Sequence, residues 1–389
     1  MKRESLGGAL VWTPENLLIL GAGFSLNAGL PVAKDFTESL LSKKRLKKGG
    51  PSRLQVDFLQ HFVSEIFNEG EAANPEAWPD LEDVFTMVDL AANTGHNLGP
   101  DWSSSDLRVV RRAIIVRMIR MLSQRYRRAK KQSDFDWSHL DRLFSTFDCS
   151  TSAVLSMNWD GVFENEIALK QNLRRVDYGC DAIACRFINT SLVKRSAAKV
   201  EPLRILKPHG SVNWLYCDAC RETFWVPANH YQIERVARTL FRQRDWEVIQ
   251  KKIGKDSQVQ VYDTACPRCE DAGTLGTRFA TFSYRKALDF PMHAASWRMA
   301  ERYLKEAVNW IFIGYSLPAA DFEIKHLLKR VQLSENLRPN ISLITGGNAG
   351  PDTIERFKKL FGDVPEEHIF CNGLDDDALE HLEALGVLT

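Results

Sequence analysis

The sequence predicts an α/β fold in which a doubly wound parallel sheet carries two insertions, one helical and one built around cysteine pairs. Short apolar runs alternate with amphipathic segments of helical period, as expected for a parallel sheet covered by helices on both faces. A long stretch of helical patterning interrupts this alternation after the first strand–helix unit, and two Cys-x-x-Cys pairs interrupt it later.

Five apolar runs bounded by turn residues are the predicted strands. They are Asn16–Leu20, Ala153–Met157, Leu203–Lys207, Trp310–Ile313 and Ile341–Ile344. The segments between them predict helices at Ala33–Lys48, Asp160–Lys170, Ser296–Val308, Asp321–Val331 and Pro351–Phe361. We therefore divide the chain into a sheet domain formed by 10–50, 138–215 and 281–389, a helical insertion at 51–137 and a cysteine-bearing insertion at 216–280.

The composition is that of an ordinary globular protein, with 44% hydrophobic and 26% charged residues. A net charge of +1 gives no bulk attraction to nucleic acid or to membranes. The first residues are too polar for a signal peptide, and no apolar run approaches the ~20 residues that span a bilayer. We therefore expect a cytoplasmic protein.

One predicted helix, Leu107–Gln132, is strongly basic. It carries ten Lys or Arg residues and no acid. Either this is a solvated face paired with acids elsewhere, or it contacts nucleic acid or an acidic partner.

The first predicted strand runs into Gly21-Ala22-Gly23-Phe24-Ser25. Glycines at a strand end let the backbone turn sharply and approach a ligand, and a helix N-terminus behind the turn attracts phosphate. The pattern is half of a dinucleotide-binding fingerprint, because the third glycine falls only at Gly29. An ordinary strand–helix turn is the alternative.

Polar residues follow two further strands. Asn158 and Asp160 follow the second strand, and His209 follows the third. Ligands bind at the carboxyl edge of open parallel sheets, and an imidazole there suits proton transfer near neutral pH. The alternatives are that Asp160 only caps the next helix and that His209 is structural.

Small residues follow the last two strands, at Gly314-Tyr315-Ser316 and at Gly346-Gly347-Asn348. They would admit a ribose or an adenine against the backbone, and plain loops are the alternative.

Two cysteine pairs, Cys217 with Cys220 and Cys266 with Cys269, have the spacing of zinc knuckles. The 45 residues between the pairs exceed the usual spacing, and a polar helix around Tyr231–Lys252 would account for the difference. Four thiolates leave no position for water, so the expected zinc is structural. A redox pair is the alternative.

In order, the chain reads GAGFS, MNWD, HG, two cysteine pairs, GYSL and GGN, a set more specific than any of its members. In this order it resembles the sirtuin superfamily, and more closely the bacterial sirtuin-like NAD-hydrolase branch of anti-phage defence. The resemblance covers most of residues 10–350. It implies that the sheet domain is a Rossmann-like NAD-binding domain and that 216–280 binds structural Zn²⁺.

The resemblance also implies roles for matching residues. Catalysis would fall to Asn158, His209 and Asp160, with Asn158 and Asp160 beside the nicotinamide ribose. The remaining contacts to NAD would come from Gly21, Ala22, Gly23, Phe24, Ser25, Gly314, Ser316 and Asn348.

The departures from classical deacylases concern the substrate. Val32-Ala33-Lys34 stands where those enzymes carry Asp-Phe-Arg, and Trp159 stands where they usually carry isoleucine. The stretch Ala280–Phe290 resembles the hydrolase branch better than an acyl-lysine-binding loop. These differences favour water as the acceptor, so we expect NAD⁺ to be hydrolysed to nicotinamide and ADP-ribose. The alternatives are a protein deacylase, an ADP-ribosyltransferase or a non-catalytic nucleotide-sensing subunit.

A hydrolase that depletes NAD must be controlled, and no sensor domain is evident in the sequence. The resemblance implies a homo-oligomer and a separate sensor, for which a hexameric translocase-type ATPase, an Argonaute-like protein and a phage component are the candidates. Nucleic acid would be reached through that partner.

Overall fold

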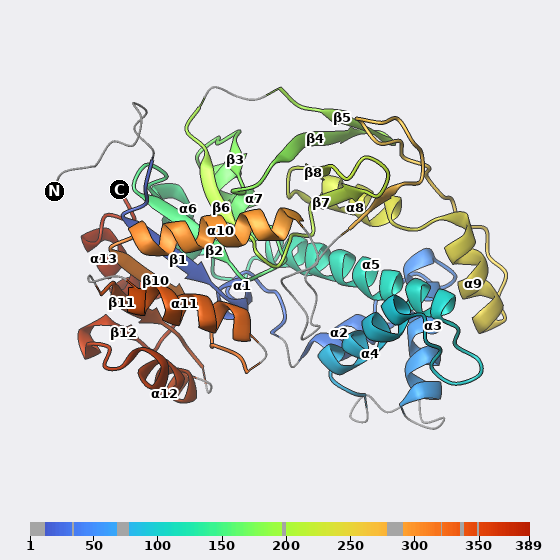
Figure 1. The fold of residues 1–389 in the computed structure, drawn as a ribbon, viewed down its shortest axis with the longest axis horizontal. Coiled ribbons are helices and arrows are strands. Elements are labelled where there is room, and N and C mark those ends of the chain that lie inside the picture. The colour runs from blue at the N-terminus through green and yellow to red at the C-terminus, as the bar shows by residue number, and fades with distance from the viewer. Residues whose placement is uncertain are drawn as a thin grey trace.

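The computed structural model describes residues 12–32, 35–67, 78–196, 200–277, 291–319, 321–334, 338–347 and 350–389. Within these ranges the main sheet has seven strands in the order β12-β11-β10-β1-β2-β6-β3 (Figure 1). Every pairing in it is parallel. The predicted α/β class and parallel sheet are therefore confirmed.

The strands of the main sheet are β1 (Asn16–Leu20), β2 (Ser152–Ser156), β3 (Val176–Asp177), β6 (Leu203–Leu206), β10 (Asn309–Ile313), β11 (Asn340–Ile344) and β12 (Ile369–Phe370). The five predicted strands are all present to within one residue at each end. The two that the sequence did not predict, β3 and β12, are edge strands too short to carry an apolar pattern.

Both faces of the main sheet are covered, as the continuous apolar strands require. In β1, Leu18 and Leu20 pack into one core and Leu17 and Ile19 into the other. The first core is shared with α1 (Ala22–Leu26), α6 (Ser138–Thr146), α7 (Val162–Lys170) and α13 (Asp376–Ala384). The second is shared with α10 (Pro291–Glu306), α11 (Phe322–Ser334) and α12 (Gly350–Phe361).

A ladder of asparagine amides, of which Asn16 and Asn309 are buried, fixes the register at the amino ends of the strands. Asn309 Nδ2 donates to Asn16 Oδ1 at 2.8 Å, and Asn340 Nδ2 donates to Asn309 Oδ1 at 3.0 Å. These residues are level with one another in the parallel pairings. Slipping one strand would leave a buried amide unpaired, so the ladder specifies the register.

The segment expected to be a helical insertion contains α3 (Pro51–Ile66), α4 (Leu81–Thr94) and α5 (Ser104–Ala129), and α2 (Phe36–Leu41) precedes it. The predicted helix Ala33–Lys48 is wrong in extent. Its first two residues lie outside the described ranges, and α2 ends where Ser42 adopts extended backbone at ψ 129°. The cluster of five Lys and Arg residues that follows disfavours a further helical turn.

A second sheet runs in the order β5-β4-β8-β7-β9 among the described residues. Its strands are β4 (Ala182–Ile188), β5 (Ser191–Lys194), β7 (Trp214–Cys217), β8 (Thr223–Trp225) and β9 (Leu275–Gly276). The hairpin of β4 and β5 precedes the 216–280 segment, and the sequence analysis did not predict it.

The single helix expected at Tyr231–Lys252 is two helices, α8 (His230–Thr239) and α9 (Gln243–Ile253). The break has a local cause. Arg242 adopts extended backbone, and its N–H donates to the carboxylate of Asp245 at 3.0 Å, which begins α9 as a new helix. No helix in the described part of the chain combines the length and apolar character needed to cross a bilayer.

Candidate active site

The register of the main sheet brings the predicted motifs to one edge. Leu20 is level with Ser156 on one side and with Ile313 on the other, and Leu155 is level with Leu206. The turns that follow β1, β2, β6 and β10 therefore start at nearly the same height. The chain order reverses between β1 and β10, and such a switch point is where open α/β sheets bind ligands.

The glycine turn after β1 packs directly against the turn after β10. A Cβ on Gly21 would lie 2.5 Å from the Gly314 carbonyl oxygen, and one on Gly23 would lie 2.9 Å from the Gly314 Cα. The Gly21 carbonyl accepts a hydrogen bond from the Phe24 N–H at 3.0 Å. Backbone contact is thus one reason for these glycines, beside the ligand approach that the sequence predicted.

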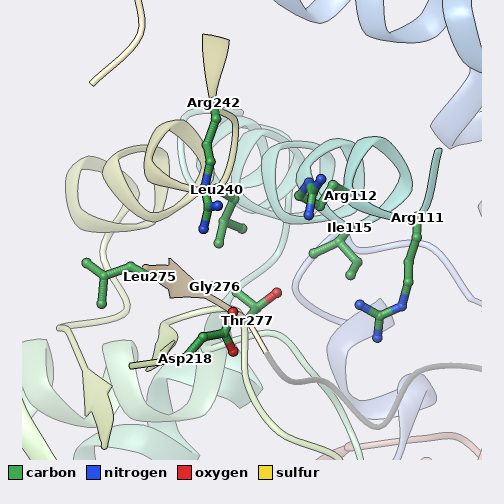
Figure 2. Close-up of a pocket in the computed structure, with 9 residues that line it drawn as sticks. All are labelled: Arg111, Arg112, Ile115, Asp218, Leu240, Arg242, Leu275, Gly276 and Thr277. Atoms are coloured by element: carbon green, nitrogen blue, oxygen red, sulfur yellow. The ribbon is translucent and has the colours of Figure 1, made fainter. Parts of the chain in front are cut away.

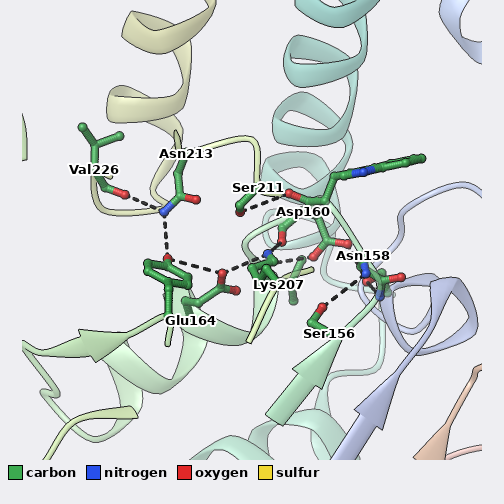
Figure 3. Close-up of polar contacts among 12 residues, drawn as sticks. Ser156, Asn158, Asp160, Glu164, Lys207, Ser211, Asn213 and Val226 are labelled. Carbon is green, nitrogen blue, oxygen red and sulfur yellow. Dashed lines mark hydrogen bonds and ion pairs between the residues drawn. The ribbon is translucent and has the colours of Figure 1, made fainter. Parts of the chain in front are cut away.

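Asn158 reaches from the end of β2 into this turn (Figure 3). Its side-chain nitrogen donates to the Gly21 carbonyl at 2.7 Å and to Ser25 Oγ at 3.0 Å. Ser25 Oγ in turn donates to Asp160 Oδ2 at 2.7 Å. Asn158, Asp160 and the GAGFS turn therefore form one hydrogen-bonded group.

Asp160 also has a local role. Its Oδ1 accepts the N–H of Val162 at 3.0 Å, which orders the start of α7. The carboxylate thus serves the helix start and the Ser25 hydroxyl together, so the capping alternative holds without excluding a role in the site.

His209 lies in a tight turn made by the segment Lys207-Pro208-His209-Gly210. The Gly210 N–H donates to the Lys207 carbonyl at 2.9 Å, and Gly210 has a positive φ of 82°. Proline second and glycine fourth suit such a turn. His209 is only 4% exposed, and its ring lies 6.1 Å from that of Trp297 on α10.

The His209 turn is bonded to the Asn158–Asp160 loop. The Val212 N–H donates to the Trp159 carbonyl at 2.8 Å, and Ser211 Oγ donates to the same carbonyl at 3.3 Å. The structure thus joins these two predicted site segments.

A buried polar chain behind the site was not predicted from the sequence (Figure 3). Lys207 Nζ donates to the Asp160 carbonyl and lies 2.9 Å from Glu164 Oε1. Asn213 Nδ2 donates to Tyr178 Oη at 3.0 Å, and Tyr178 Oη lies 3.5 Å from Glu164 Oε1. The only sequence signal was a lysine directly continuing an apolar strand.

Burial raises the pKa of Tyr178 well above its ordinary value, and the Glu164 carboxylate adds to the rise. Tyr178 therefore stays a neutral hydroxyl across the physiological range. Tyr315 in the GYSL turn behaves alike, because burial and the nearby Asp321 carboxylate both raise its pKa.

Of the residues predicted to contact the adenosine half of NAD, the structure describes Gly314 and Ser316. Gly314 contacts the glycine turn as described, and the Ser316 carbonyl accepts a hydrogen bond from Arg356 Nε at 2.8 Å. Asn348 and the stretch Ala280–Phe290 lie outside the described residues.

The four predicted zinc ligands meet. The Sγ atoms of Cys217, Cys220, Cys266 and Cys269 all lie within 4.8 Å of one another, and two of the pairs are 3.7 Å apart. Zn–S bonds of about 2.3 Å in a tetrahedron place sulfurs about 3.8 Å apart, so the cluster fits zinc.

The two cysteine pairs have the same backbone geometry. In each, the N–H four residues after the first cysteine donates back to that cysteine's carbonyl, and that residue, Arg221 or Glu270, has positive φ. Burial raises the pKa of the Cys217 thiol, but hydrogen bonds from the Cys220 backbone and the Thr274 hydroxyl bring it down to about 7. The thiol is thus readily deprotonated for a metal.

The basic helix α5 is paired rather than free along much of its length. Arg111 contacts Asp89 at 2.6 Å, and Arg112 contacts Asp245 at 2.8 Å. Arg117 and Arg120 are buried. Pairing with acids on other elements is observed for Arg111, Arg112 and Arg120, which contacts Glu234 at 3.4 Å. Arg117 instead donates to the Leu40 carbonyl, and the burial of Arg117 and Arg120 does not fit the expected solvated face.

A cavity of about 60 Å³ lies beside α5 (Figure 2). It is lined by Arg111, Arg112, Ile115, Asp218, Leu240, Arg242, Leu275, Gly276 and Thr277. None of the predicted catalytic or NAD-binding residues lines it.

No protein-family model and no curated protein matches the sequence. Among solved structures, the chain is similar to Sir2 with a p53 peptide and NAD⁺, at 13% identity and a TM-score of 0.33, over 96% of this chain and 93% of that one. It is also similar to a histidine-to-alanine Sir2 variant with deacetylated p53 peptide and 3′-O-acetyl ADP ribose, at 12% identity and a TM-score of 0.33, over 96% and 94%. Both of these neighbours are Sir2 structures.

Proposed function

We propose that this protein cleaves the bond between nicotinamide and ribose in NAD⁺ and passes the ribose to water, releasing nicotinamide and ADP-ribose. The observation that supports this most is the hydrogen-bonded group of Asn158, Ser25 and Asp160 at the β1–β10 switch point, with the His209 turn bonded to it. The order of the motifs along the sequence resembles that of sirtuins, and this resemblance supports NAD as the ligand.

Breaking this bond leaves positive charge on the ribose, as in glycoside hydrolysis. Asp160 would stabilise that charge or position the nicotinamide carboxamide. Asn158 already donates from its side-chain nitrogen within the protein, so its side-chain oxygen is the atom that would accept from a ribose hydroxyl or the attacking water. His209 would take the proton from that hydroxyl or water.

The test is product analysis. The purified chain, alone and together with the products of its neighbouring genes, is incubated with NAD⁺ with and without an acetylated peptide, and products are identified by mass spectrometry. We expect free ADP-ribose in both cases. Formation of O-acetyl-ADP-ribose would instead favour a deacylase, and a modified protein would favour an ADP-ribosyltransferase.

Two variants assign the residues. Asn158→Ala and His209→Ala should each lower NAD⁺ cleavage by at least about 100-fold, while His326→Ala, an exposed histidine on α11, serves as the matched control. Full activity in a folded Asn158→Ala or His209→Ala protein would overturn the assignment.

We further propose, from the sequence resemblance, that cleavage acts in anti-phage defence in the cytoplasm and is switched on by oligomerisation or a separate partner. An ATPase or Argonaute-like subunit would carry any contact to nucleic acid. The measurement is NAD in cells that express the chain with its neighbouring genes, before and after infection. NAD that stays constant while the chain is present and infection proceeds would contradict this role.

A further inference from the structure

We infer that Lys207 is the positioning residue that holds the two loops of the proposed active site in register. The inference deepens the proposed function and rests on it for its kinetic consequence. Its structural part, that Lys207 orders the two loops, stands on the contacts alone.

Lys207 contacts one loop through its backbone carbonyl and the other loop through its side-chain Nζ. Its carbonyl accepts the Gly210 N–H and so closes the turn that carries His209. Its Nζ donates to the carbonyl of Asp160 in the neighbouring loop. One residue therefore sets the position of the proposed base relative to the proposed carboxylate.

The contact belongs to a small cross-link between the loops. The Trp159 carbonyl, one residue before Asp160, accepts from the Val212 N–H and from Ser211 Oγ. Ser211 and Val212 follow the His209 turn, whereas Lys207 begins it. Lys207 adds a hydrogen bond from its charged Nζ to the Asp160 carbonyl. Hydrogen bonds from a charged donor are the stronger kind.

The burial of Lys207 argues that the position has a use beyond packing. Its side chain is 0% exposed, and its counterion Glu164 is 4% exposed. A buried ion pair of this kind is often no more stabilising than apolar residues of similar volume. A methionine would fill the same space, but it would leave the Asp160 carbonyl without this donor.

The kinetic consequence follows from geometry. Displacement of about 1 Å between reacting groups lowers rates on the order of 100-fold. The glycine turn and the β10 loop are not bonded to Lys207 among the described residues, so NAD⁺ binding should change little. The expected signature is a loss in kcat with KM nearly constant.

The test variant is Lys207→Met combined with Glu164→Gln, which removes the donor and leaves no unpaired buried charge. The control is Lys130→Met with Glu166→Gln, an ion pair between a partly exposed lysine that follows α5 and a buried glutamate on α7. We expect a fall in kcat on the order of 100-fold for the first variant and a change within about threefold for the control. Zinc content and cooperative melting report folding of both.

Hydrogen–deuterium exchange tests the same proposal without an activity assay. Amides of Val162 and Gly210 should exchange faster in the test variant than in the control. A folded test variant with wild-type kcat, or with unchanged exchange at both amides, overturns the inference. If the wild-type chain cleaves no NAD⁺, the proposed function fails, and the exchange result alone decides the role of Lys207.

A second variant covers failure of the first to fold. Ser211→Ala removes one bond of the cross-link and disturbs no charge. A fall in kcat above about threefold with constant KM, together with faster exchange at Val162, would support the inference, and unchanged values of both would overturn it.

Discussion

The backbone N–H of Gly23 donates to the carbonyl oxygen of Gly314 at 2.9 Å, so the turns after β1 and β10 are joined directly. These glycines lie 291 residues apart in the sequence and meet at the switch point of the sheet. Close backbone packing therefore requires glycine at these positions, whether or not a dinucleotide binds. Any substitution here tests the fold before it tests ligand binding.

Gly314→Ala should destabilise the protein by more than about 2 kcal/mol. Gly314 has a φ of +61°, where an L-residue is strained by roughly 1–2 kcal/mol, and its Cβ would lie 2.1 Å from the Phe24 nitrogen. Gly95→Ala is the matched control, because Gly95 has a φ of +78° but open space around its Cβ. Denaturant unfolding measures both, and equal losses of stability would show that the backbone contact is unimportant.

Ser25→Ala should lower NAD⁺ cleavage by about tenfold while the fold persists. The hydroxyl links Asn158 to Asp160 through bonds of 3.0 and 2.7 Å, and a hydrogen bond to a charged group such as a carboxylate contributes about 1.5–3 kcal/mol. Turnover of purified protein and its melting temperature are the measurements. A variant that melts lower but turns over normally would assign Ser25 to stability alone.

Cys220→Ser should lower the zinc content and the melting temperature together, because a structural zinc site supplies folding energy directly. Cys371→Ser is the control, since Cys371 is exposed and lies outside the sulfur cluster. Elemental analysis gives zinc per chain. A Cys220→Ser protein that keeps full zinc and full thermal stability would contradict the four-thiolate site.

The main sheet was predictable because its strands are apolar on both faces, and such runs stand out from their surroundings. The asparagines that begin β10 and β11 were missed as strand residues, because asparagine is typical of turns and their amide partners lie on neighbouring strands. The β4–β5 hairpin was missed because its residues alternate between buried and exposed over a short span.

The candidate site was predictable where a motif lies within one segment, and unpredictable where segments meet. Asn158, Asp160 and His209 could be identified from strand ends. Lys207 and Glu164 could not, because an ion pair between a strand end and a helix depends on which strands are neighbours. The sequence allowed that α5 pairs with acids elsewhere, but which acids they are could not be predicted for the same reason.

Lys130→Met should destabilise the protein by about 1–3 kcal/mol, because it leaves the carboxylate of Glu166, whose side chain is 0% exposed, without its ion-pair partner at 2.7 Å. Lys131→Met, at the next and exposed position of the same basic segment, should change stability by less than about 0.5 kcal/mol. Chemical denaturation separates the two. Equal effects would show that the Lys130–Glu166 contact contributes nothing measurable.

Acidification should weaken the fold in part through His230, which joins α8 to α5. Burial lowers the pKa of His230, and the Arg127 guanidinium lowers it further. The ring Nε2 faces Arg127 at 3.2 Å and must accept, so Nδ1 carries the proton toward Ser123 Oγ at 2.8 Å. Above pH of about 6.5 the ring is neutral in both the folded and the unfolded chain, and this residue adds no pH dependence.

Below that pH the unfolded chain binds a proton that the folded chain resists, so the free energy of unfolding falls as the pH falls. Arg127→Met removes one of the causes that lower the pKa of His230 and should raise that pKa toward its ordinary value, which an NMR titration of the histidine ring protons measures. His381 is the internal control, because burial and His368 lower its pKa without Arg127. An Arg127→Met protein in which the His230 pKa does not move would refute this account of the α5–α8 contact.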